Sequence, residues 1–252
     1  MRVLVTVGIF PPDIGGPATF VPKIAKYFQD ELNYEIEILT LSDNKNLNIN
    51  DDFSVKRIDR NLPIIYRWLK TIFTIYKLGK NKDLIFVNGL GTEATIANIF
   101  LKKKIIRKIV GDPVWERAYS KAKISESFDE FQVKNYGFSI SLQKKVRSFS
   151  IKKSDIVVTP SKHLKNFIVN LGFKNKIEII NNGVFIPEEN TNIFTNDQIN
   201  ITIVSRLVSH KNIEKIIKAI SDLNSPLINL NIIGDGPELN QLQKISLESN
   251  NK

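Results

Sequence analysis

The chain has 252 residues, of which 42% are hydrophobic and 25% are charged, a composition typical of a globular protein with one large or two medium-sized domains. It contains no cysteine, which excludes disulfides, thiolate nucleophiles and cysteine-bound metals and fits a reducing compartment. No apolar run approaches the ~18 residues that a membrane-spanning helix needs, and the N-terminus has no signal-peptide pattern.

A formal net charge of +10 requires a partner or a solvated surface. Basic residues are densest at positions 102–108 and 144–153. Three interpretations compete: a solvated surface, the anionic surface of a membrane, and nucleic acid. No zinc-finger, RNA-stacking or basic recognition-helix pattern accompanies the charge, so nucleic acid is the least favoured partner.

The first 185 residues alternate short apolar runs with segments of helical spacing, which predicts a parallel, doubly wound α/β sheet. The expected strands are residues 3–7, 35–40, 55–58, 84–87, 105–110, 156–158 and 177–180. The expected helices are residues 21–32, 65–76, 94–101, 142–151 and 164–171. In the second of these helices, the apolar face formed by Ile65, Leu69, Ile72, Phe73 and Tyr76 is interpreted as core.

A glycine-rich loop at residues 8–17 follows the first strand and precedes the first helix. Because glycine has no Cβ, Gly15 and Gly16 could present backbone amides to a phosphate or a sugar. An ordinary strand-to-helix turn explains the same residues. The loop is not the G-x-G-x-x-G dinucleotide fingerprint, which argues against a dehydrogenase.

Chemically active side chains gather after the fifth strand, in the segment from Gly111 to Arg117. Asp112 is interpreted either as a base or hydroxyl-binding group, or as a helix N-cap ahead of Pro113. Trp115 and Glu116 offer an apolar wall and a second carboxylate on the acceptor side. The following residues 117–141 lose periodicity and suggest a lid, an acceptor-binding flap or an element that touches a membrane.

Two further features of the first half concern the helix at 164–171. Ser161 precedes this helix and is a candidate N-cap. His163 is interpreted as a surface residue of the same helix rather than a catalyst.

The polar stretch 186–198 reads as an interdomain connection between a first domain at 1–185 and a second at 199–252. The second domain begins with a strand, a loop that carries Arg206 and Lys211, and a helix. A second strand then leads into the Gly234-Asp235-Gly236-Pro237 turn. Strand ends and helix N-termini in such βαβα layers suit phosphate-bearing ligands, and two such domains place a cleft between them.

Several of these motifs, in this order, resemble glycosyltransferase family 4, group 1 enzymes of the GT-B fold. The resemblance rests on the segments at 10–17, 159–161, 182–184, 206–211 and 234–238 and covers nearly the whole chain. The segment at 110–116 looks like a subgroup that makes bacterial surface polysaccharides or lipid-linked glycans.

The resemblance implies a retaining, metal-independent hexosyltransferase that moves a sugar from a nucleoside-diphosphate sugar, such as a UDP- or GDP-sugar, to a glycan or lipid-linked acceptor. No further cofactor and no metal site are implied. Arg206 and Lys211 would hold the donor diphosphate, since fixed cations must replace a metal. Asp112 would take the place where many relatives carry a histidine that contacts sugar.

Other donor-binding positions follow from the same resemblance. Gly15 and Gly16 would lie near the donor phosphate and the reacting sugar. Gly234 and Gly236 would shape the nucleoside pocket, with Glu238 contributing to it. The implied location is cytoplasmic, peripheral on the inner face of the plasma membrane.

The chain ends at Lys252, before the Glu-x7-Glu motif and the final helix of that family, so we expect a C-terminally truncated chain that is inactive in this form. Two alternatives accompany the transferase hypothesis. One is a non-catalytic protein of the same fold that binds a nucleotide sugar or a membrane surface, and the other is a sugar-nucleotide epimerase.

Overall fold

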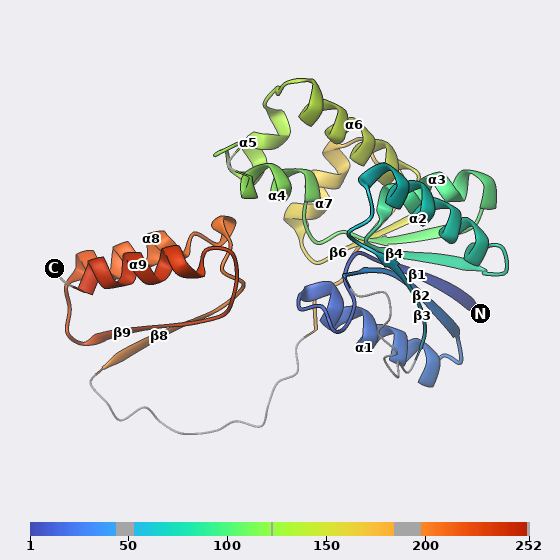
Figure 1. Ribbon diagram of the computed structural model, residues 1–252. Coiled ribbons are helices and arrows are strands. Elements are labelled where there is room, and N and C mark those ends of the chain that lie inside the picture. Colours follow the sequence, from blue (N-terminus) through green and yellow to red (C-terminus); the bar gives the residue numbers. More distant parts are fainter. Residues whose placement is uncertain (44–52, 122, 184–197, 251–252) are drawn as a thin grey trace. The chain divides into compact units, whose positions relative to one another are not determined.

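The computed structural model describes residues 1–43, 53–121, 123–183 and 198–250. The chain divides into two compact units, one of residues 1–112 and 136–183 and the other of residues 113–135 and 184–252 (Figure 1). The expected connection at 186–198 falls almost wholly outside the described residues, so the domain boundaries drawn from the sequence stay a prediction. The grouping of residues 113–135 with the second unit was not indicated by the sequence.

The first unit is built around a parallel sheet of seven strands. These are β1 (Arg2–Val7), β2 (Glu35–Ser42), β3 (Ser54–Asp59), β4 (Leu84–Asn88), β5 (Lys104–Lys108), β6 (Ile156–Thr159) and β7 (Lys176–Ile179). They lie in the order β3-β2-β1-β4-β5-β6-β7, and each neighbouring pair is parallel. The predicted parallel α/β sheet is therefore confirmed, and its strand order reverses between β1 and β4, where such sheets bind ligands.

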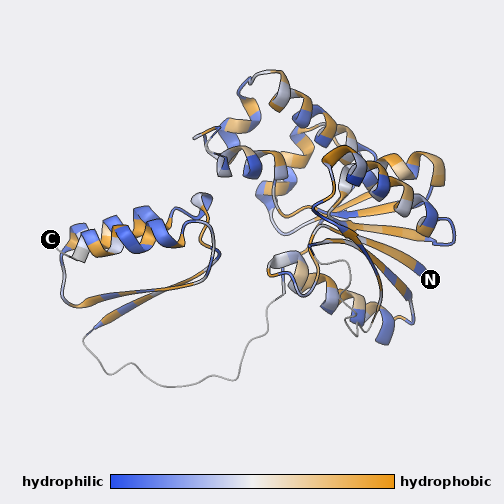
Figure 2. Ribbon diagram, in the orientation of Figure 1, coloured by the Kyte–Doolittle hydropathy of each residue, from blue (hydrophilic) through white to orange (hydrophobic). Residues whose placement is uncertain are grey.

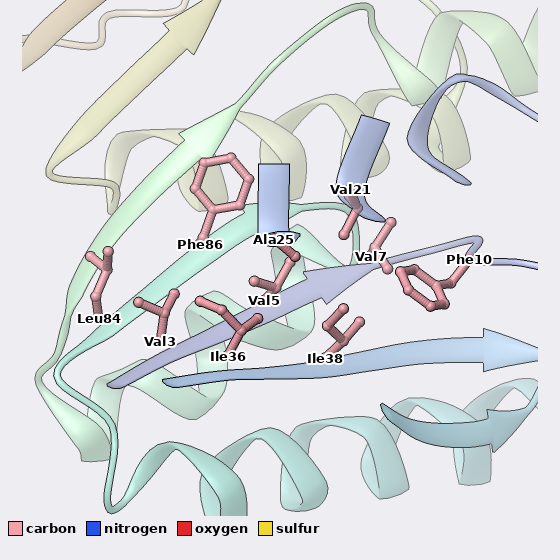
Figure 3. Packing of buried hydrophobic residues seen from close by; sticks show 10 residues of the cluster. All are labelled: Val3, Val5, Val7, Phe10, Val21, Ala25, Ile36, Ile38, Leu84 and Phe86. Carbon is pink, nitrogen blue, oxygen red and sulfur yellow. The ribbon is translucent and has the colours of Figure 1, made fainter. Parts of the chain in front are cut away.

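Helices cover both faces of this sheet. They are α1 (Gly16–Asp30), α2 (Ile64–Gly79), α3 (Gly91–Leu101), α6 (Phe138–Lys152) and α7 (Lys162–Asn170). On one face, Val21 and Ala25 of α1 pack against Val3, Val5 and Val7 of β1, in the cluster drawn in Figure 3. On the other face, residues of α2 and α3 pack against alternate residues of the same strands.

The sequence of β1 explains why it is the central strand. Its residues from Val3 to Val7 are all buried, and four of the five are apolar. A continuous apolar run fits a parallel strand covered on both faces, and Figure 2 shows hydrophobic residues along the central strands.

The helix α2 differs from its expected packing. Of the five residues interpreted as core, Ile72 and Tyr76 do pack against the cluster of α2, α3 and the sheet. Ile65, Leu69 and Phe73, however, are 73%, 56% and 66% exposed. That part of the prediction is wrong, because the buried side of α2 consists of Thr71, Ile75 and Gly79 instead.

The second unit contains a two-stranded parallel sheet with helices packed on it. Its elements are α4 (Pro113–Ser120), α5 (Phe128–Val133), β8 (Ile199–Val204), η1 (Ser209–Lys211), α8 (Ile213–Leu223), β9 (Ile228–Ile233) and α9 (Leu239–Asn250). Leu207, Ile213, Ile217 and Leu242 form its buried core. The predicted order of strand, loop and helix is confirmed for both of its βα pairs.

The aperiodic segment 117–141 forms the end of α4, the short helix α5 and the start of α6. A capping box begins α5: the Ser127 hydroxyl accepts from the Glu130 backbone N–H, and the Glu130 carboxylate accepts from the Ser127 N–H. Within the described ranges, no helix combines the length and apolar character needed to cross a membrane.

Candidate functional site

The carboxyl ends of the strands in the first unit form a pocket of about 390 Å³. Its polar lining comes from Lys23 of α1, Asn88 at the end of β4, Lys108 at the end of β5, and Asn182 after β7. Gly16 and Phe20 of α1 also line it. This is the edge at which open parallel α/β sheets hold ligands.

Lys108 is one of the two lysines in this pocket lining. Its Nζ donates a hydrogen bond to Oδ1 of Asn182 at 2.8 Å and lies 3.4 Å from the centre of the Phe20 ring. Burial lowers the pKa of Lys108. In the described part of the chain no carboxylate forms an ion pair with this lysine, so an anion in the pocket would meet an unneutralised charge.

The two glycines of the first loop have different roles. Gly15 has a φ of +154°, and a Cβ there would lie 2.7 Å from Cδ1 of Ile9, so both backbone and packing favour glycine. Gly16 begins α1 and lines the pocket, and a Cβ there would meet nothing within 4 Å. Gly15 therefore fits the turn interpretation, whereas Gly16 opens the N-terminus of α1 toward the pocket.

Asp112 is completely buried rather than open to a ligand. Its carboxylate pairs with the guanidinium of Arg147 in α6, which is itself 8% exposed. Burial lowers the pKa of Arg147, and the charge of Asp112 opposes that shift. α4 begins at Pro113, as one of the two interpretations of Asp112 required, and the buried Asp112 carboxylate presents no surface to a sugar hydroxyl.

Arg107 shows that the basic segment 102–108 is not simply a solvated surface. Its guanidinium is buried and donates to Oγ of Ser150 at 2.7 Å, Oγ1 of Thr95 at 2.8 Å and the Gly91 carbonyl at 3.1 Å. Burial lowers the pKa of Arg107 to about 10, against the opposing charge of Glu93. Arg107 thus ties α3 and α6 to β5.

In the second unit, Arg206 and Lys211 lie between the end of β8 and the start of α8. Both side chains are exposed, and neither forms an ion pair with any residue that the structure describes. The residue before α8, Asn212, has a φ of 54° and makes no side-chain cap. Two free cations therefore lie beside a helix N-terminus that attracts anions.

His210 belongs to the same loop and was not singled out by the sequence. Its ring meets the Trp115 ring edge to face, with centroids 6.3 Å apart. Its Nδ1 is buried and has no hydrogen-bond partner among the described residues. Burial lowers the pKa of His210, and the charges of Lys211 and Arg206 lower it further, so the imidazole is neutral at pH 7.

Gly234 and Gly236 let two loops of the second unit approach closely. A Cβ on Gly234 would lie 1.9 Å from the Ser205 carbonyl oxygen, and one on Gly236 would lie 2.3 Å from that of Leu207. The backbone N–H of Leu207 donates to the Asp235 carbonyl at 2.9 Å, and that of Glu238 donates to the Leu207 carbonyl at 3.2 Å. The structure thus brings the Gly-Asp-Gly turn beside the loop of Arg206 and Lys211.

Glu238 is half-buried at the end of this turn. Burial raises the pKa of Glu238, and the neighbouring charge of Glu214 in the first turn of α8 raises it further. The carboxyl group is therefore easier to protonate than an ordinary glutamate.

Trp115 and Glu116 lie on α4 in the second unit. Trp115 packs against Tyr119 and Phe128, with ring centroids 5.3 and 5.8 Å apart, and its Nε1 donates to the Glu126 carbonyl at 3.1 Å. The expected apolar wall is thus the edge of an aromatic cluster that also contacts His210. Glu116 is exposed on the same helix.

The comparisons with known proteins agree with this description. Residues 186–252 match the family model described as "Glycosyl transferases group 1". This match covers 67 of the 252 residues. The chain is 28% identical to the "Uncharacterized glycosyltransferase MJ1069" of Methanocaldococcus jannaschii, over 98% of this chain and 66% of that protein. It therefore spans just under two thirds of this relative's length.

Two solved structures have a similar fold. One is Anabaena Alr3699/HepE in complex with UDP and glucose, with a TM-score of 0.65 and 16% identity over 100% of this chain and 67% of that one. The other is a UDP-N-acetylglucosamine 2-epimerase, with a TM-score of 0.56 and 11% identity over 100% of this chain and 67% of that one. The fold is of the GT-B type, as expected from the sequence.

Proposed function

We propose that the chain serves in a retaining, metal-independent glycosyltransferase of the hexosyltransferase type, and that its donor is a nucleoside-diphosphate sugar such as a UDP- or GDP-sugar. The observation that carries the proposal is the pair of exposed, unneutralised cations Arg206 and Lys211 at the end of β8, inside the segment that matches the group 1 family model. The similarity to a structure that holds UDP and glucose supports the choice of donor.

The chemistry assigns these cations a direct role. When the bond between the sugar C1 and the diphosphate oxygen breaks, its electron pair stays on the leaving diphosphate, which gains negative charge. Arg206 can hold phosphate oxygens with a two-pronged guanidinium, and Lys211 adds a point charge. The uncapped N-terminus of α8 adds backbone N–H groups, and neutral His210 keeps a third positive charge away from the resting site.

We place the acceptor hydroxyl and its glycan or lipid carrier at the pocket of the first unit. Lys108 faces that pocket without an acidic partner in the described ranges, and Lys23 adds a second cation. Phe20, Pro17 and Val110 supply apolar lining. A phosphate-bearing acceptor, as in a lipid-linked glycan for surface polysaccharide or glycolipid synthesis, fits this combination, and such an acceptor places the enzyme in the cytoplasm at the inner face of the membrane.

Asp112 has a different part in this proposal from the catalytic role that the resemblance implied. Its buried ion pair with Arg147 joins the end of the segment after β5 to α6. We therefore assign it as a residue that positions the segment after β5. The expected donor contacts of Gly15, Gly16, Gly234, Gly236 and Glu238 remain part of the proposal.

The alternative of an epimerase rests on the similarity to a UDP-N-acetylglucosamine 2-epimerase. Such an enzyme converts a nucleotide sugar without an acceptor, so product analysis in the absence of acceptor separates the two functions. A non-catalytic binding protein would bind nucleotide sugars and form no product with or without an acceptor.

The test measures nucleotide binding and sugar transfer separately. UDP and GDP binding to the 252-residue chain is measured by calorimetry, and transfer by a full-length enzyme that contains this chain is assayed with a panel of UDP- and GDP-sugars and lipid-phosphate acceptors. Arg206→Ala and Lys211→Ala should each lower transfer about 10²–10³-fold and weaken nucleotide binding, since each removes a donor to the leaving group. The matched control is Lys215→Ala, which removes an exposed lysine of α8.

Three results would contradict the proposal: no nucleotide binding by the chain, full transfer in both variants, or an equal loss in Lys215→Ala. Metal independence is tested by adding a chelator to the transfer assay, where the proposal expects an unchanged rate.

A further inference from the structure

One helix of the first unit exposes an apolar and basic surface that its own sheet does not cover. We define the α2 face as the outward residues Ile65, Tyr66, Leu69, Lys70, Phe73 and Lys77. The exposed fractions of Ile65, Tyr66, Leu69 and Phe73 are 73%, 55%, 56% and 66%, and both lysines are exposed. Isolated exposed apolar residues are ordinary, but a contiguous group of this kind marks an interaction surface.

The spacing of these residues makes the α2 face one continuous stripe. Ile65, Leu69, Phe73 and Lys77 follow one another at intervals of four residues, and Tyr66 and Lys70 form the adjacent row, so all six lie on one side of the helix. The opposite side, with Thr71, Ile75 and Gly79, is buried against the first unit. The α2 face therefore cannot turn inward without exposing the residues that now form the core.

The charge of the surrounding segment has a single sign. Residues 60–80 contain five cations and no aspartate or glutamate. Arg60 pairs with Asp13 and Asp43, and the other four are Arg67, Lys70, Lys77 and Lys80. Lys70 and Lys77 form no ion pair within the described ranges. The Lys70 ammonium lies 5.9 Å from the Tyr66 ring centre and that of Lys80 lies 4.7 Å from the Tyr76 ring centre, which keeps these lysines beside the apolar stripe.

The position of the α2 face in the fold is also informative. α2 follows β3, so its N-terminal half begins at the carboxyl edge of the parallel sheet. The pocket of the first unit is lined by residues at the carboxyl ends of β4 and β5. The most apolar part of α2 therefore belongs to the edge of the sheet that carries the pocket.

Two occupants of this surface can be compared by charge. A second copy of the chain in a two-fold dimer would bury the lysines of both α2 faces in one interface, and lysine is depleted in the centres of protein interfaces. An anionic lipid bilayer neutralises the lysines and accepts tyrosine and aliphatic side chains at the level of its headgroups. We propose that the α2 face docks the first unit on the anionic surface of a membrane.

This inference stands on the α2 face alone and does not depend on sugar transfer. The 252-residue chain is mixed with vesicles of phosphatidylcholine, with or without phosphatidylglycerol, and the bound fraction is measured by co-flotation at two salt concentrations. We expect binding to vesicles with phosphatidylglycerol, weak binding to pure phosphatidylcholine, and weaker binding at high salt because surface charges are screened.

Two pairs of substitutions separate the two components of the surface. Lys70→Gln with Lys77→Gln should lower the partition coefficient on anionic vesicles roughly thirtyfold, since each lysine near such a surface strengthens binding roughly fivefold. Leu69→Ser with Phe73→Ser should lower it roughly tenfold or more through the lost apolar contact. All four side chains are exposed, so the melting temperature should not change.

Matched controls carry the same changes elsewhere. Lys26→Gln with Lys215→Gln removes two exposed lysines, and Val169→Ser with Leu247→Ser removes two apolar side chains that are 49% and 67% exposed. Neither control should lower vesicle binding more than about twofold, because the substituted residues lie outside the α2 face.

Three results would overturn the proposal. The first is wild-type protein that stays unbound on anionic vesicles, and the second is control variants that lose as much binding as those of the α2 face. The third is a concentration-dependent dimer that Leu69→Ser with Phe73→Ser dissociates, since this would assign the surface to a second copy. Nucleotide binding by the same variants, measured separately, should be unchanged.

Discussion

The sheets of the two units are built from similar lengths of strand but bury them differently. In β1 of the first unit all residues from Val3 to Val7 are buried, because helices lie on both faces of the sheet. In β8 of the second unit no residue is fully buried, and its side chains alternate between half-buried and exposed. The sequences show the cause: β1 is apolar on both faces, whereas β8 alternates isoleucine with asparagine and threonine.

The difference in burial predicts that the second unit is the less stable of the two. Among the described residues, apolar clusters lie on both faces of the first unit's sheet, whereas the cluster in the second unit consists of four buried residues. The loops of Arg206, Lys211 and Gly234–Glu238 belong to the second unit. Binding loops generally belong to the less stable parts of a protein. Variants in matched positions of the two units test whether the second unit is less stable than the first.

The largest expected effect comes from the buried ion pair of the first unit. Arg147→Met leaves the Asp112 carboxylate buried without its partner, which should cost about 3–5 kcal/mol of unfolding free energy. The measurement is urea unfolding followed by circular dichroism. The matched variant in the second unit is Lys218→Met, which removes the partner of Glu214 in an exposed pair of α8 and should leave stability nearly unchanged. Similar losses in both variants would contradict the comparison.

A smaller difference is expected from the two apolar cores. Ile85→Ala in β4 removes a side chain with no exposed surface and should cost about 2–5 kcal/mol. Ile203→Ala in β8 removes a half-buried side chain and should cost roughly 1 kcal/mol, in proportion to the smaller area withdrawn from water. Hydrogen exchange resolved along the chain checks both, and the comparison fails if Ile203→Ala is the more damaging change.

The helix starts of the two units provide the next test. The Ser161 hydroxyl accepts a hydrogen bond from the Leu164 N–H at 3.2 Å and caps α7, so Ser161→Ala should cost about 1 kcal/mol. Asn212 precedes α8 in a left-handed conformation without a side-chain cap. Asn212→Gly should therefore change stability by only a few tenths of a kcal/mol, and thermal unfolding of both variants distinguishes the two starts.

The smallest effect is a pH dependence that arises from His210. Burial and the charges of Lys211 and Arg206 lower the pKa of His210 in the folded protein. The neutral imidazole therefore stabilises the second unit above the ordinary histidine pKa of about 6.5, and this contribution is lost as the pH falls through the lower folded value. NMR titration of the imidazole should show a midpoint below 6.5.

A variant identifies the source of that shift. Lys211→Ala should raise the pKa of His210, because one of the two nearby positive charges is removed. Addition of inorganic diphosphate to the wild-type protein should raise it as well if the anion binds between Arg206 and Lys211. A pKa that responds to neither change would show that these cations do not act on His210.

Sequence patterns predicted those parts of the fold that depend on neighbouring residues. Apolar runs marked every strand of the seven-stranded sheet, helical spacing marked its helices, and the cap at Ser161 was read from its residue type and position. The candidate loops of the second unit were also found in sequence, because Arg206, Lys211 and the Gly-Asp-Gly turn each follow a strand.

Sequence patterns could not predict contacts between residues that are far apart in the chain. The partner of Asp112 is Arg147, 35 positions away, and the aromatic neighbour of His210 is Trp115, on a different element. Lys108 was counted in a run of basic residues, although strand alternation directs it toward Asn182 and Phe20. On α2, spacing identified an apolar stripe but could not reveal that the first unit packs on the opposite side of the helix.

The central place of β1 has a consequence for how the chain is made. The strand at the N-terminus pairs with β2 on one edge and with β4 on the other, where Val3 lies opposite Leu84. During synthesis at about 5–20 residues per second, the second edge of β1 therefore stays unpaired for several seconds after the strand itself has been made. An open, apolar strand edge is a template for aggregation, so this edge of β1 is exposed to wrong pairing until β4 emerges.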